Sequence, residues 1–86
     1  MRILFSNKSQ KQLSNLNPFI REKIIKVIDK LENGERVDIS KMKGEVNQFR
    51  VRVGEYRILL DKLPNGDFLL TEIGKRENIY FFGFLV

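Results

Sequence analysis

The 86-residue sequence contains no cysteine, no histidine and no tryptophan. The absence of cysteine excludes a disulfide framework, a thiolate zinc site and a cysteine nucleophile. The absence of histidine removes the most common general base and the most common transition-metal ligand. Any chemistry that the chain performs must therefore be carried by arginine, lysine, tyrosine, a carboxylate or a bound ion.

Long apolar segments are absent as well. The apolar stretch at residues 3–5 is too short for the apolar region of a signal peptide. The longest apolar stretch, at residues 79–86, is far shorter than the roughly 20 residues that cross a bilayer. We therefore expect a cytoplasmic protein with no membrane partner.

The length predicts a single domain over residues 1–86, because two separate cores would each be too small to be stable. With 42% hydrophobic and 31% charged residues, the composition is that of a globular protein. Sixteen lysines and arginines against 11 acidic residues leave a formal net charge of +5. This excess favours a polyanionic partner, although many basic domains bind no polyanion.

Two helices follow a short first strand in the predicted order. Residues 2–5 are typical of a strand, and Ser6 or Asn7 can cap a helix over residues 8–16. Asn17 and Pro18 then suit the N-cap and first position of a second helix, which Gly34 ends. Its apolar residues recur at helical spacing: Ile20, Ile24, Val27, Ile28 and Leu31. These segments predict a helical hairpin with one apolar face.

Residues 35–46 have no clean periodicity and are predicted to form a loop. The loop carries Lys41, Lys43 and Gly44, which favour a mobile basic segment, although an ordinary solvated connector would look the same. From Phe49 onwards the periodicity changes to two, as in a strand. Gly54 and Glu55 stand between two alternating runs, which is the signal of a two-residue hairpin turn. A third strand over residues 68–73 completes the fold: α+β, with an N-terminal strand, a two-helix hairpin and an antiparallel three-strand meander, helices packed on one sheet face.

Counting outward from the predicted turn places three arginines on one face of the hairpin. Arg52 lies opposite Arg57, and Arg50 shares their face, while the other face is apolar and suits the helices. Directly opposed like charges are unfavourable, and Asp61 on the same face could relieve them. Arginine stems on a solvated face would give the same pattern, but the planar guanidinium suits bidentate phosphate contacts. Gly74 is expected to release the chain from the sheet and to bring Lys75, Arg76 and Tyr80 near this face.

The chain resembles the RelE branch of the RelE/ParE toxin superfamily, the small ribonucleases of type II toxin–antitoxin pairs. The resemblance extends from the first strand to Tyr80. It is most specific at Lys43-Gly44, at residues 49–57 (FRVRVGEYR) and at residues 73–80 (IGKRENIY). It implies cleavage of mRNA in the ribosomal decoding site and inhibition by a cognate antitoxin protein.

The resemblance also implies roles for individual residues. The catalytic set would be Arg50, Arg52, Arg57, Arg76 and Tyr80, with Lys41, Lys43 and Lys75 contacting RNA. The RNA 2′-hydroxyl would attack its own phosphodiester, which needs no metal, no cofactor and no protein nucleophile. Arg57 and Arg76 would bind the phosphate, Arg50 or Arg52 would stabilise the alkoxide, and Tyr80 would stack on the nucleotide.

The sequence departs from relatives at two points. Many relatives have lysine where this chain has Arg50 and Arg52. Many also continue in a polar helix after the tyrosine, whereas residues 81–86 (FFGFLV) are mostly apolar. Such a tail would be buried, paired at a sheet edge or covered by the antitoxin. The assignment of Tyr80 fails if the tail displaces it from the arginine face.

Two other functions are compatible with the same resemblance. One is a ParE-type inhibitor of DNA gyrase, which does not need the basic strand or the late Lys-Arg-x-x-x-Tyr pattern. The other is a catalytically inactive relative that binds nucleic acid or antitoxin. The complete arginine set favours the ribonuclease over both.

Overall fold

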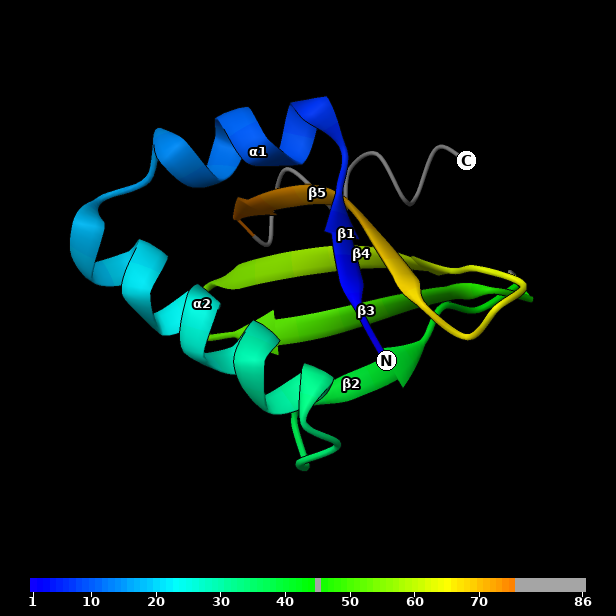
Figure 1. Ribbon diagram of the computed structural model, residues 1–86. Coiled ribbons are helices and arrows are strands. Elements are labelled where there is room, and N and C mark those ends of the chain that lie inside the picture. Colours follow the sequence, from blue (N-terminus) through cyan, green and yellow to red (C-terminus); the bar gives the residue numbers. More distant parts are fainter. Residues whose placement is uncertain (45, 76–86) are drawn as a thin grey trace.

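The computed structural model describes residues 1–44 and 46–75, which form one mixed sheet and two helices (Figure 1). The elements in chain order are β1 (Ile3–Phe5), α1 (Asn7–Ser14), α2 (Pro18–Glu32), β2 (Ile39–Lys41), β3 (Gln48–Val53), β4 (Tyr56–Lys62) and β5 (Phe68–Lys75). The strand order is β1-β5-β4-β3-β2, in which β1 is parallel to β5 and the other pairs are antiparallel. The predicted α+β class is confirmed. Within the described residues, no helix is long and apolar enough to cross a membrane.

Both helices begin at the predicted caps. The Ser6 hydroxyl accepts the N–H of Ser9 at the start of α1, and the Asn17 side chain accepts the N–H of Phe19 at the start of α2. Pro18 occupies the first position of α2, where a backbone N–H would have no helical partner. At the other end, Gly34 has a φ of 76°, which favours glycine and stops the helix.

The core lies between α2 and one face of the sheet (Figure 1). Because apolar residues of α2 recur every three or four positions, one stripe of the helix is buried, and it contains Ile24, Ile28 and Leu31. The sheet contributes alternate residues of its central strands, namely Val51, Ile58, Leu60, Leu70 and Ile73. Helix α2 therefore covers the face that the sequence predicts to be apolar, and the opposite face of the sheet carries the arginines.

The prediction that residues 35–46 form only a loop is wrong. Ile39–Lys41 forms β2, which pairs with β3 through Ile39 opposite Val51 and Ser40 opposite Arg50. The meander therefore has four strands rather than three. A three-residue edge strand with a single apolar side chain gives almost no periodic signal, and its pairing with β3 stabilises it instead.

The third predicted strand is longer than expected. β5 continues to Lys75, so Gly74 does not release the chain from the sheet but pairs with Arg57 inside it. The pairing of β4 with β5 shifts between Leu59 and Leu60. This bulge lets both Leu70 and Ile73 face the core although they are three residues apart.

Helix α1 covers the outer edge of β5 beyond the end of β1 (Figure 1). The Ser9 hydroxyl donates to the carbonyl of Leu70 at 2.8 Å, and the Gln12 side-chain oxygen accepts the N–H of Ile73 at 2.7 Å. Lys8 forms an ion pair with Glu72 of the same strand. Side chains of α1 thus make the hydrogen bonds that a further strand would otherwise make at this edge.

Candidate functional site

The three arginines of the β3–β4 hairpin lie on one face of the sheet, as predicted. The register has Val53 opposite Tyr56, Arg52 opposite Arg57, and Arg50 opposite Leu59. The turn between the strands contains Gly54 with a φ of 58°, and glycine at the first turn position suits a tight two-residue hairpin. Because the turn sets the register, it also sets the positions of the arginines.

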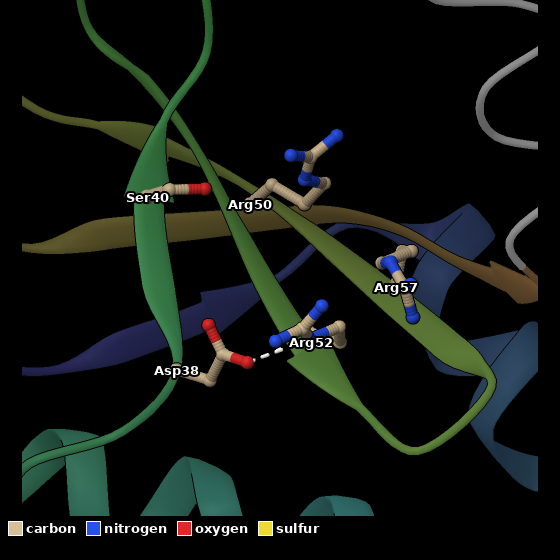
Figure 2. Close-up of a pocket in the computed structure, with 5 residues that line it drawn as sticks. All are labelled: Asp38, Ser40, Arg50, Arg52 and Arg57. Carbon is tan, nitrogen blue, oxygen red and sulfur yellow. Dashed lines mark hydrogen bonds and ion pairs between the residues drawn. The ribbon is translucent and has the colours of Figure 1, made fainter.

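A pocket of about 160 Å³ opens on this face. It is lined by Asp38, Ser40, Arg50, Arg52 and Arg57 (Figure 2). Three adjacent strands contribute to it, because Arg50 and Arg52 come from β3, Arg57 from β4, and Ser40 from β2. Its lining contains three guanidinium groups and one carboxylate, so the pocket carries a net positive charge.

Arg52 is held by the residue that precedes β2. Its backbone N–H donates to the carbonyl of Asp38 at 2.9 Å, and its Nε donates to Oδ2 of Asp38 at 2.6 Å (Figure 2). Both side chains remain open to solvent, with 60% of Arg52 and 54% of Asp38 exposed. The Arg52 guanidinium is therefore oriented and yet accessible to a ligand.

Arg57 is held in a different way. Its side chain bends toward the hairpin turn, where Nη1 donates to the carbonyls of Gly54 and Tyr56, each at 3.0 Å. Only 4% of the residue is exposed. Burial and two carbonyl bonds fix this cation at the wall of the pocket, so it needs little reorganisation when a ligand binds.

Arg50 lies on β3 two residues before Arg52, farther from the hairpin turn, and pairs with Ser40 on β2. It is half-buried, and Figure 2 shows the Ser40 side chain directed toward it. A guanidinium presents up to five N–H donors in a planar array that matches the oxygens of a phosphate. The pocket therefore suits an anionic ligand that is rich in oxygen atoms.

Comparison with known proteins identifies the family. The protein "Toxin RelE3" of Methanocaldococcus jannaschii is 34% identical to this chain, over 93% of the chain and 96% of the relative. The chain belongs to the RelE toxin family. A scan against models of protein families finds no match.

Two solved complexes have a similar fold. The RelB–RelE antitoxin–toxin complex from Methanococcus jannaschii matches with a TM-score of 0.77 and 29% identity, over 92% of this chain and 96% of that one. The archaeal RelE–RelB complex from Pyrococcus horikoshii OT3 matches with a TM-score of 0.71 and 21% identity, over 87% and 93%. As a RelE toxin, the chain is the toxin of a type II toxin–antitoxin system, and its family supports an endoribonuclease role.

The structure brings together part of the site that the RelE resemblance implies. Arg50, Arg52 and Arg57 line one pocket. Arg76 and Tyr80 lie outside the described residues, as does the apolar tail at residues 81–86.

The three candidate RNA-binding lysines are all exposed, but the register separates two of them from the arginines. Lys41 lies opposite Phe49 and Lys75 lies opposite Tyr56, and both partners belong to the face that packs against the core. Lys43 is in the turn that follows β2. Lys41 and Lys75 therefore belong to the core side of the sheet, and neither lines the pocket that contains the three arginines.

Two lining residues are missing from the sequence-based site, Asp38 and Ser40. Both belong to the segment predicted to be a loop. The only sequence signal for them is weak: Val37 and Ile39 alternate with Asp38 and Ser40, as residues on the two faces of a strand do, but over four residues alone. Asp38, rather than the predicted Asp61, is the carboxylate bonded to an arginine of the opposed pair.

Proposed function

We propose that this chain cleaves mRNA on the ribosome by attack of the RNA 2′-hydroxyl on the adjacent phosphodiester, without a metal ion. A bond forms between the 2′-oxygen and phosphorus while the bond from phosphorus to the 5′-oxygen breaks. The 2′-hydroxyl loses its proton and the leaving 5′-oxygen gains one. The products are a 2′,3′-cyclic phosphate and a free 5′-hydroxyl.

The convergence of three arginines on one pocket carries this proposal. The transition state has extra negative charge on the phosphorane oxygens, and donors oriented in advance stabilise it more than the ground state. Arg57 is already fixed by two carbonyls, and Arg52 is fixed by Asp38. Positive charge of this kind can replace the electrostatic contribution of a metal ion.

Each residue has a proposed role in the reaction. Arg57 and Arg76 bind the scissile phosphate. Arg50 or Arg52 stabilises the developing alkoxide, which promotes loss of the 2′-proton, and Tyr80 stacks on the scissile nucleotide. Lys41, Lys43 and Lys75 contact RNA farther from the cleaved bond. Since arginine is a poor proton acceptor, we expect slow cleavage off the ribosome, where ribosomal RNA no longer aligns the substrate.

We also propose a cognate antitoxin protein as the partner. The two solved relatives described above are toxins in complex with RelB. An antitoxin that presents acidic residues would neutralise the arginine face and exclude mRNA from it. The cytoplasm, where translating ribosomes are found, is the proposed location.

A ribosome-programmed cleavage assay tests the proposal. The wild-type protein should cut end-labelled mRNA, and the Arg57→Ala/Arg76→Ala variant should not, while its circular dichroism spectrum persists. The exposed Arg52 offers a cleaner single change, because Arg52→Ala removes no buried group. Lys30→Ala is the matched control, since it removes one positive charge from the exposed side of α2.

The substrate itself provides the decisive control. Replacing the scissile 2′-hydroxyl by hydrogen should abolish cleavage, because that oxygen is the nucleophile. Cleavage of the 2′-deoxy substrate, or products with a 5′-phosphate, would contradict the mechanism. Inhibition of DNA supercoiling with intact mRNA would support the gyrase inhibitor instead.

A further inference from the structure

We propose that Asp38 is a positioning residue, which holds the guanidinium of Arg52 in the orientation that the RNA phosphate requires. This inference rests on the proposed function, because it gives Asp38 a task in the same pocket. Asp38 lies 14 residues before Arg52 in the sequence and immediately before β2. The pairing of β2 with β3 is what brings the two residues together.

Asp38 binds Arg52 both at its backbone and at its side chain. The Asp38 carbonyl accepts the backbone N–H of Arg52 at 2.9 Å, and Oδ2 accepts Nε at 2.6 Å. An exposed arginine otherwise samples many rotamers, and ordering it on a ligand costs entropy. Because the Nε bond restricts the side chain before RNA arrives, part of that entropy is lost during folding rather than during the reaction.

The choice of Nε determines which donors remain for a ligand. Arginine has one N–H at Nε and four at the two terminal nitrogens. Asp38 approaches Arg52 from the β2 side, whereas Arg57 lies on the opposite side (Figure 2). With Nε engaged, the terminal nitrogens are the donors available to phosphate oxygens in the pocket.

The carboxylate also changes the electrostatics of the pocket. It offsets the repulsion between Arg52 and Arg57, which lie directly opposite each other. At the same time, a negative charge beside the pocket weakens the attraction for RNA before the reaction begins. Positioning therefore affects the rate constant of cleavage, whereas the negative charge affects the dissociation constant for RNA. Asp38 should raise the rate of the cleavage step without improving RNA binding.

The test compares Asp38→Ala with Asp38→Asn in single-turnover cleavage on programmed ribosomes. The alanine variant should cleave on the order of 10-fold more slowly, with RNA binding unchanged or tighter. The asparagine variant keeps an oxygen that can accept Nε and should recover most of the rate. Glu22→Ala is the matched control, because it removes a carboxylate from another exposed ion pair, with Lys26 on α2, and should leave the rate unchanged.

The double variant Asp38→Ala/Arg52→Ala tests whether Asp38 acts through Arg52 alone. If Asp38 acts only through Arg52, then Asp38→Ala should not slow the Arg52→Ala variant any further. A direct readout is the NMR resonance of the Arg52 Nε–H, whose protection from solvent exchange should be lost in Asp38→Ala and kept in Asp38→Asn.

Several results would overturn the inference. These are a wild-type rate in Asp38→Ala, equally slow cleavage by Asp38→Asn and Asp38→Ala, or a further loss in the double variant. In each case wild type still cleaves and Arg52→Ala is still impaired, so the proposed function stands. If the wild-type protein cuts no mRNA, or Arg52→Ala cuts normally, then the role of this pocket in cleavage fails and the inference fails with it.

Discussion

Arg52 and Arg57 lie directly opposite each other on β3 and β4, but their guanidinium groups bond to different acceptors. Arg52 donates to the carboxylate of Asp38 on its β2 side, whereas Arg57 donates to the carbonyls of Gly54 and Tyr56. Two like charges can therefore occupy neighbouring positions without a ligand. The repulsion between the two guanidinium groups is overcome during folding, so both charges are already in place when a phosphate binds.

Arg57→Lys should lower the free energy of unfolding by about 1–2 kcal/mol, because hydrogen bonds from a buried charged group to the turn are lost. Lysine is a point donor on a flexible stem and cannot reproduce a planar group bonded to two carbonyls. The measurement is urea unfolding followed by circular dichroism.

The matched control for this change is Arg52→Lys on the opposing strand. Arg52 is largely exposed, so its replacement should change the free energy of unfolding by less than about 0.5 kcal/mol. Equal losses for the two variants would contradict a structural role for the buried Arg57 in the hairpin turn.

The hairpin was predictable because its information is local. Gly54 and Glu55 define the turn, and counting outward from them gives the pairing of Arg52 with Arg57. The caps of both helices were predictable for the same reason, since Ser6 and Asn17 bond only a few residues away.

The rest of the site depends on contacts between distant segments. Asp38 reaches Arg52 only because β2 pairs with β3, and a three-residue strand has too few side chains to show a period. The burial of Arg57 does not follow from the alternation either, because alternation predicts only that it lies on the open face of the sheet. Its side chain lies on that face but bends toward the turn, because the carbonyls of Gly54 and Tyr56 accept its Nη1.

Gln12→Ala should lower the free energy of unfolding by about 1–2 kcal/mol. The Gln12 side chain accepts the N–H of Ile73, and its loss removes that acceptor from a partly buried edge. The urea midpoint is the measurement, and Gln10→Ala is the control because Gln10 is exposed and makes only a long 3.4 Å bond to Phe5. An unchanged midpoint in Gln12→Ala would show that α1 does not stabilise the edge of β5 through this bond.

The Asp67 carboxyl, at the turn between β4 and β5, should make a pH-dependent contribution to the free energy of unfolding. The hydrogen bond from the Arg2 backbone N–H, at 2.9 Å, is the main cause that lowers the pKa of the Asp67 carboxyl, and Asn65 adds a side-chain bond. A carboxylate with a lowered pKa in the folded state stabilises the fold above its unfolded value of about 3.9. This contribution is lost as the pH falls through the folded value.

Asp67→Asn should therefore unfold at lower urea than the wild type at pH 7, and the two midpoints should converge below about pH 4. Asparagine can still accept the Arg2 N–H, but it cannot also accept the bond from Asn65, so the pH dependence of the difference, and not its size at pH 7, reports the charge. Asp29→Asn provides a reference for the loss of a carboxylate from an exposed position on α2. A midpoint difference that stays constant from neutral to acidic pH would contradict the assignment to Asp67.

The salt dependence of RNA binding reports how many arginines contact phosphates. For single strands, each neutralised phosphate contributes about 0.7 to the slope of log K against log salt concentration. With an uncleavable 2′-O-methyl oligonucleotide, Arg50→Ala and Arg52→Ala should each reduce the magnitude of the slope by about 0.7, as measured by fluorescence anisotropy. Lys30→Ala, on the exposed side of α2, should leave the slope unchanged although it removes the same charge. Equal reductions in all three variants would mean that RNA responds to the net charge of +5 rather than to the pocket, because a diffuse attraction does not depend on which cation is removed.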